Sequence, residues 1–514
     1  MRLRGVGRRY GLAGPWVLRG VDLDLPARAL VRVEGANGTG KSTLLRLLAG
    51  IDAPSEGRIT GRGPRTAYVP ERFSAALPFT AAGYLAHLGR IHGLRPADAA
   101  ARASHRLTRF GAAAHAGTPL AELSKGTSQK VAVAQALLAE PELLVLDEAW
   151  TGLDTEARGE LDLAVAERVA AGATVVYVDH DPHRLAGAVD AAYRVEGQAL
   201  VPAPLDAPDA APRPPGPDRG DVRAGHPAPG PAARRSGGHG RSGRHGAAHG
   251  PGRALRRPAV RAAHGPPAVA HQPGDGGRCS GRPPGLPGRG AMTALIRYQA
   301  DLLVRSQRWT APVLLYAAFL AVGVRAGQPV LDSLGYTAAG LLPVTAWLVR
   351  VCAGQEPPAA RTVVAAAAGG QPRAHLAALL TALGCAGLLG TAATAVVLVI
   401  SDPAGTDHTV RVPLPAAGLA GLLATACCVL LGAGVGALCT RPLLHGRGWS
   451  MAATVLASLL ALVTTGSPAK YAVTGLVTGS LTGTVHVPVL PLLGAAAVAA
   501  AALALACRLT AVRG

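Results

Sequence analysis

The segment GANGTGKS, residues 35–42, constrains the fold of this chain more than any other stretch. An apolar run at 29–33 precedes it, and an apolar, helix-forming stretch at 41–49 follows it. Gly50 can cap the end of that helix. The sequence therefore predicts a strand, a glycine-rich loop and a helix in direct succession, which indicates an α/β domain.

The chemistry of this loop indicates a nucleotide phosphate site. Its glycines let the backbone wrap closely and point N–H groups at phosphate oxygens, and the helix N-terminus favours the same anion. Lys41 is expected to reach the β- and γ-phosphates, and Ser42 to ligate Mg²⁺. Lysine occurs only four times in the chain, which argues against a chance match. The loop residues expected to bind ATP are Gly35, Asn37, Gly38, Gly40, Lys41, Ser42 and Thr43.

A second strand is expected where the run 143–146 is wholly apolar, as in a parallel strand buried on both faces. It ends in two carboxylates, Asp147 and Glu148. Asp147 is expected to hold Mg²⁺, and Glu148 to polarise the attacking water. Such a strand end is common alone, but it is specific when it follows a phosphate-binding loop.

The stretch AELSKGTSQKVAVAQALLAEP, residues 121–141, resembles the signature motif of ABC-type ATPases, whose usual form is LSGGQ. The order of the phosphate loop, this motif, the Asp-Glu strand, GLD at 152–154 and VVYVDHD with His180 matches that family at each step. Tyr10 stands where the family has an adenine-stacking aromatic residue. YVPE at 68–71 stands where a segment usually ends in Gln. The resemblance covers residues 1–202.

The resemblance implies that two such domains pair head to tail around ATP. The signature residues Ser124, Lys125 and Gly126 of one copy would face the phosphate loop of the other, from the N-terminus of an amphipathic helix. His180 would contact the γ-phosphate, and Glu71 would ligate Mg²⁺ in place of the usual Gln. Lys125 and Thr127 depart from the usual Gly and Gln of the motif.

Long apolar runs dominate the chain from about residue 309, and a membrane helix needs about 20 mainly apolar residues. Six spans are predicted, at 310–328, 334–353, 374–400, 415–439, 450–466 and 487–507. With the N-terminal domain in the cytoplasm, ten basic residues fall inside and three (Arg325, Arg411 and Lys470) outside, as the positive-inside rule requires. The topology resembles ABC-2-type exporter permeases. The stretch 355–373 is expected to lie on the ATPase surface.

Residues 205–291 contain 16 Pro and 19 Gly and carry +9 of the chain's net +20 charge. Such a segment cannot bury enough apolar surface to order itself, so it is expected to be a disordered linker. Basic tether, metal-binding and nucleic-acid functions are weaker alternatives. The preferred hypothesis is a shifted reading frame that joins two adjacent genes, because the composition is that of a GC-rich gene read out of frame. Met292 would then be the natural start of the permease gene. Resequencing codons 200–295 tests this, and an unbroken frame with ordinary third-position bias would refute it.

The expected protein is therefore an ATP hydrolase with three parts: an ATP-binding domain at 1–204, a linker at 205–291 and an all-α permease at 292–514. It would act in the plasma (inner) membrane as a homodimer or a paired half-transporter, with both termini cytoplasmic, and export an unidentified substrate using ATP and Mg²⁺. The alternative is a regulatory, immunity or sensory output rather than transport. No nucleic-acid partner is expected, since the first domain carries only +3 net charge.

Overall fold

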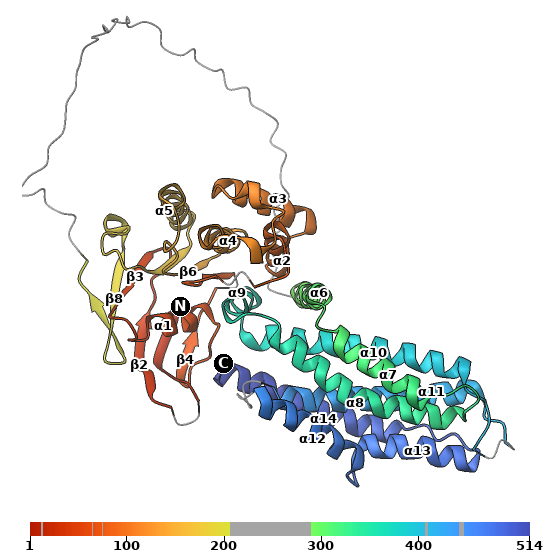
Figure 1. Cartoon of the computed structure of the whole chain (residues 1–514). Coiled ribbons are helices and arrows are strands. Elements are labelled where there is room, and N and C mark those ends of the chain that lie inside the picture. The colour runs from red at the N-terminus through yellow and green to blue at the C-terminus, as the bar shows by residue number, and fades with distance from the viewer. Residues whose placement is uncertain are drawn as a thin grey trace, which may run out of the picture. The chain divides into compact units, whose positions relative to one another are not determined.

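The computed structural model describes residues 1–11, 14–63, 65–73, 76–205, 289–406, 410–440 and 447–513. Met1–Pro208 and Pro284–Gly514 form one compact unit, and Figure 1 shows its elements. Nearly all of the predicted linker lies outside the described residues. The shifted-frame hypothesis therefore stays a prediction.

The N-terminal part contains two sheets, as expected for an α/β domain. The larger sheet has the strand order β5-β6-β7-β3-β8-β9, in which only β9 runs antiparallel to its neighbour. Its strands are β5 (Thr66–Val69), β6 (Leu143–Asp147), β7 (Thr174–Val178), β3 (Leu30–Glu34), β8 (Ala191–Glu196) and β9 (Ala199–Ala203). The smaller sheet is antiparallel, with β1 (Arg2–Arg9) between β2 (Trp16–Asp24) and β4 (Glu56–Thr60). Every residue of β6 is buried, which explains its unbroken apolar run.

Five α-helices accompany these sheets within the described residues: α1 (Lys41–Ala49), α2 (Ala81–Ile91), α3 (Pro96–Arg109), α4 (Lys125–Leu137) and α5 (Thr155–Ala170). Helix α1 has the predicted bounds, and Gly50 ends it in a left-handed conformation with φ of 74°. Side-chain oxygens of Thr80, Ser124 and Asp154 cap the N-termini of α2, α4 and α5. Local capping signals therefore fix where these helices begin.

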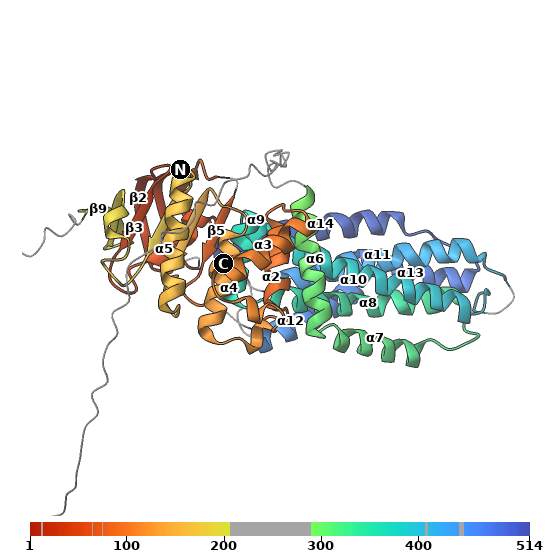
Figure 2. The same cartoon turned by 90° about the horizontal axis from the view of Figure 1, so that it is seen from above.

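The described C-terminal residues form helices alone, apart from short bridges. They are α6 (Arg289–Ser306), α7 (Thr310–Gly323), α8 (Val330–Gly354), α9 (Pro358–Ala368), α10 (Gln371–Ile400), α11 (Leu414–Leu438), α12 (Arg447–Val463), α13 (Pro468–Thr482) and α14 (Val489–Arg513). The long helices run side by side in both views (Figures 1 and 2), and α11 packs against α8, α10 and α14.

The span prediction holds for four helices. In the described part of the chain α8, α10, α11 and α14 are long and apolar enough to cross a membrane. Helices α12 and α13 bend by 49° at a short break and count as a fifth span if they are taken together. Helix α7 has 14 residues, about 21 Å, which is shorter than the hydrocarbon core. The structure thus gives four or five candidate spans where six were predicted, because α7 ends early and α12, with 17 residues, counts as a span only together with α13.

Small residues allow two of these helices to approach closely. A methyl group at Gly432 of α11 would lie 2.4 Å from the Leu342 carbonyl oxygen of α8. At Gly436, one turn further on, it would lie 2.8 Å from the Ala346 carbonyl oxygen. Neither position has room for a side chain, so the backbones of α8 and α11 are in contact there. This is the packing that small residues permit in membrane helices.

Candidate nucleotide-binding site

The predicted site residues gather at one edge of the six-stranded sheet. Strands β5, β6, β7 and β3 are neighbours and parallel, so their carboxyl ends meet at the same edge. Glu71 follows β5, Glu148 follows β6, His180 follows β7, and the glycine-rich loop follows β3. Crevices beyond the carboxyl ends of parallel strands are where such sheets bind ligands.

The loop between β3 and α1 has the backbone that its glycines predicted. Gly35, Gly38 and Gly40 have φ angles of 143°, 80° and 106°, which residues other than glycine rarely adopt. The tip of the loop at Asn37 is exposed. The Lys41 ammonium donates to the carbonyl oxygens of Gly35 at 2.8 Å and Ala36 at 3.0 Å. Its charge is therefore held at the mouth of the loop, beside the N-terminus of α1.

The metal-side pair predicted from the sequence is in contact. The Ser42 hydroxyl donates to Asp147 Oδ1 at 3.1 Å, and the Tyr68 hydroxyl donates to Asp147 Oδ2 at 2.8 Å. Burial raises the pKa of Asp147 above its usual value, and the carboxylates of Glu148 and Glu71 add to that shift. Burial also raises the pKa of Tyr68 well above the ordinary value for tyrosine, so its phenol stays protonated and donates. An oxygen pair with excess negative charge fits a hard cation such as Mg²⁺.

Glu148 and His180 come together across neighbouring strand ends. His180 Nε2 lies 2.9 Å from Glu148 Oε2. Glu148 has a φ of 51°, a left-handed conformation that is uncommon for glutamate, and its N–H donates to the Val178 carbonyl oxygen at 3.0 Å. Strained backbone of this kind persists at functional sites when the surroundings hold it in place. This conformation was not predicted from the sequence.

A cavity of about 360 Å³ adjoins the loop. Gly35, Lys41 and His180 line it, together with the ion pair of Arg194 and Glu34, whose charged atoms are 3.2 Å apart. The phosphate loop and the predicted γ-phosphate histidine therefore face a common space. Glu71 makes no direct contact with Asp147 among the interactions described, and its carboxylate pairs with Arg72 at 3.3 Å.

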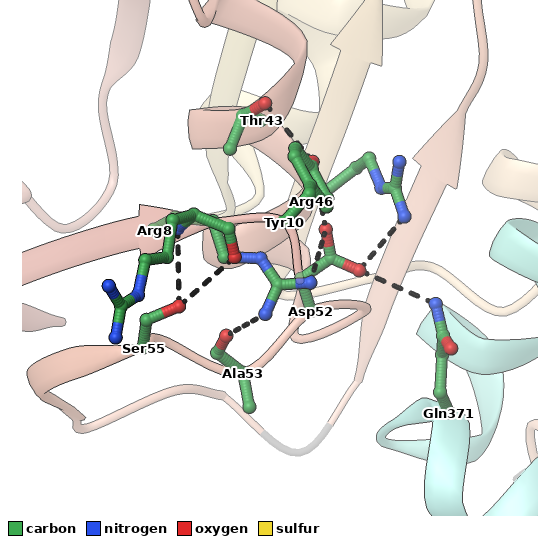
Figure 3. Close-up of polar contacts among 9 residues, drawn as sticks. Arg8, Tyr10, Thr43, Arg46, Asp52, Ala53, Ser55 and Gln371 are labelled. Atoms are coloured by element: carbon green, nitrogen blue, oxygen red, sulfur yellow. Dashed lines mark hydrogen bonds and ion pairs between the residues drawn. The ribbon is translucent and has the colours of Figure 1, made fainter. Parts of the chain in front are cut away.

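Tyr10 lies beside the start of α1. Its hydroxyl is 3.2 Å from that of Thr43, and the Arg8 guanidinium lies 4.8 Å from the centre of its ring (Figure 3). The residue is 37% exposed, which leaves part of the ring open to a stacking base. Arg8 was not singled out from the sequence, and only the fold brings it to this ring.

The signature residues begin α4, as the sequence predicted. Ser124 is its N-cap, and its hydroxyl accepts from the Thr127 N–H at 3.1 Å. Ser124 and Lys125 are exposed, and Gly126 is half-buried. Among the described hydrogen bonds, those of the Ser124 side chain stay within this turn and do not reach the 35–43 loop.

A family model described as "ABC transporter" matches residues 18–151. The zinc import ATP-binding protein ZnuC of Cereibacter sphaeroides is 42% identical over 178 residues, which are 34% of this chain and 70% of that protein. The chain therefore belongs to the ABC transporter family. It is an ATP-binding ATPase domain followed by apolar helices of a multi-pass membrane protein.

Two further similarities are to a curated export protein and to a solved structure. The macrolide export ATP-binding/permease protein MacB 1/2 of Paracoccus denitrificans is 36% identical over 235 residues, 42% of this chain and 35% of that protein. A solved structure described as an ATP binding subunit of an ABC transporter is 25% identical with a TM-score of 0.37, over 40% of this chain and 90% of that one. The chain thus spans about a third of the macrolide exporter's length.

Proposed function

We propose that this chain is one half of an ATP-driven exporter. Two ATPase domains would pair head to tail, and their closure around ATP and reopening after hydrolysis would move an ABC-2-type set of membrane helices. The observation that carries the proposal is the meeting of Lys41, Ser42, Asp147, Glu148 and His180 at one sheet edge, in a chain whose later helices are long enough to span a membrane.

The residues at this edge divide the chemistry between them. Lys41 and the loop N–H groups would hold the phosphates, and Ser42 and Asp147 would hold Mg²⁺, which neutralises phosphate charge when bound. Glu148 would orient the attacking water and accept its proton, and His180 at 2.9 Å from that carboxylate would help to keep it in place. Ser124 and the Gly126 N–H of a second copy would close the site and exclude water.

Replacing Asp147 with Asn tests the Mg²⁺ assignment. The substitution removes the charge but keeps the shape, so the Mg²⁺ concentration needed for half-maximal ATPase activity should rise by about tenfold or more. Tyr68→Phe is the matched control, because it deletes only the hydrogen bond to Asp147 Oδ2 and should cause a smaller rise. A Mg²⁺ titration of the Asp147→Asn variant that coincides with the parent curve would contradict the assignment.

The stretch 355–373, expected on the ATPase surface, contains α9, and α9 packs on β5. Its Val363 and Val364 belong to the same buried cluster as Phe79 and Tyr84 of the ATPase part. Apolar burial of this size resists separation, because each fully buried valine is worth about 1.5 kcal/mol or more. We therefore assign α9 the transmission of ATPase movement to the membrane helices.

Export is proposed because the macrolide relative also joins an ATP-binding part and a permease in one chain, according to its name. The zinc relative is named as an importer, and it matches 34% of this chain. ATP-dependent uptake of a cargo into inside-out vesicles, lost in the Glu148→Gln variant, would support export. ATPase activity without transport of any compound in a broad panel would favour the regulatory, immunity or sensory alternative. Recovery of the chain in the soluble fraction would contradict both.

A further inference from the structure

One buried carboxylate links the candidate adenine side of the site to a membrane helix (Figure 3). Asp52, which follows α1, is 3% exposed. Its Oδ1 accepts from Arg46 Nη2 at 2.9 Å and from Gln371 Nε2 at 3.4 Å. Its Oδ2 accepts from the Tyr10 hydroxyl at 3.4 Å and lies 3.9 Å from Arg8 Nη2. Oδ2 thus faces Tyr10, on the candidate nucleotide side, and Oδ1 faces Gln371.

Gln371 is the first residue of α10, and its side chain is buried against the ATPase part. The preceding Gly370 has a φ of 134°, and a methyl group built there would lie 3.6 Å from the Gly50 carbonyl oxygen. The backbone before α10 therefore passes close to the C-terminal end of α1. The other end of α1 carries Lys41 and follows the phosphate loop, so α1 and Asp52 lie between the phosphate loop and the start of α10.

We propose that Asp52 is a positioning residue that transmits nucleotide binding from Tyr10 to the first turn of α10. The inference rests on the proposed nucleotide site. The two carboxylate oxygens are rigidly joined, so a rotation that moves Oδ2 also moves Oδ1. A base stacked on Tyr10 would hold its ring and hydroxyl, which fixes the carboxylate in the orientation that accepts from Gln371. Bound nucleotide then favours this orientation of the Asp52 carboxylate, because the chain binds the nucleotide more tightly when Asp52 has that orientation.

Two arginines make this carboxylate unsuitable as the tested position. Burial raises the pKa of Asp52, while the guanidinium groups of Arg46 and Arg8 act in the opposite direction. Removing the carboxylate would leave two largely buried guanidinium groups without that partner, which is strongly destabilising. The residues that bond to each oxygen of Asp52 are the better targets. Gln371→Leu deletes the hydrogen-bond donor that α10 provides. Tyr10→Phe deletes the hydroxyl that bonds to Asp52 but keeps the ring.

The test is hydrogen exchange of the full chain in nanodiscs, with and without Mg²⁺ and a non-hydrolysable ATP analogue. The reporter is the set of amides at 375–379, the first that bond within α10. In the parent, nucleotide should slow their exchange about fivefold, since hydrogen bonds to charged groups commonly shift equilibria by about tenfold. In Gln371→Leu, with nucleotide affinity nearly unchanged, the slowing should fall below about twofold. In Tyr10→Phe, measured with the site saturated, the slowing should also fall below about twofold, and the double variant should lose no more than either single one.

Asp301→Asn is the matched control. It alters another contact between the ATPase part and the helices, the one between His87 Nε2 and Asp301 Oδ2 at 3.2 Å, which has no bond to Tyr10 or Asp52 among those described. This variant should keep the parent response. A full response in Gln371→Leu, or equal loss in Asp301→Asn, would overturn the relay while the nucleotide site stands. A parent chain that binds no nucleotide would instead overturn the proposed function, and the relay with it.

Discussion

Glu148→Gln should lower the rate of ATP hydrolysis by about 10²- to 10⁴-fold, the usual contribution of a general base. The amide has nearly the same shape as the carboxylate and can still contact His180, which lies 2.9 Å from it in the parent. It cannot accept a proton from water at neutral pH. ATP binding should be retained, since Lys41 and the loop are untouched, and the protein should accumulate with ATP bound. Phosphate release and retained radiolabelled ATP measure the two effects.

Glu71→Gln is the informative companion to that variant. It restores the residue usual at this place in the family and removes one of the negative charges that raise the pKa of Asp147. Hydrolysis should stay within about threefold of the parent, because the side chain is half exposed and makes no direct contact with Asp147 among those described. A Glu148→Gln variant as active as Glu71→Gln would show that another group activates the water.

The features that sequence predicted well are local ones. The strand, loop and helix from 29 to 50 follow from an apolar run, three glycines that need positive φ, and a capping glycine, all within one short stretch. Helix α4 begins at Lys125 for the same kind of reason, since the hydroxyl of the preceding Ser124 caps its first turn. The conformation of such residues depends on their immediate neighbours in the chain, so a single sequence without an alignment is sufficient to predict it.

The features that sequence missed depend on distant segments. Tyr68 bonds to Asp147 across 79 positions, and Gln371 bonds to Asp52 across 319. Glu148 combines its left-handed backbone with a hydrogen bond from its N–H to Val178 of β7, 30 positions further along the chain. The break between α12 and α13 falls at Gly466 and Pro468, residues that ordinarily mark a loop, so the second helix of the pair was not anticipated.

Two inactive variants of this chain should restore activity to each other. Lys41→Ala removes the ammonium that reaches the phosphates, and Gly126→Asp places a negative charge at the start of α4, where the phosphates of a partner would lie. Each variant alone should lose nearly all ATPase activity. In a dimer that contains one copy of each, one site keeps an intact loop and an intact signature, so activity should reach up to about half that of the parent dimer.

A site shared between two copies and a site formed within one chain give opposite results in this experiment. If loop and signature acted within one chain, each copy of the mixed dimer would carry a defect and no activity would return. Differently tagged copies allow the mixed dimer to be isolated, and a dimer of Lys41→Ala with itself serves as the inactive control. A methyl group at Gly126 would lie 3.0 Å from the Gly152 carbonyl oxygen, so retained ATP binding by Gly126→Asp must show that its fold is intact. Recovery in the mixed dimer alone would then place Ser124 and Gly126 on the nucleotide of the partner copy.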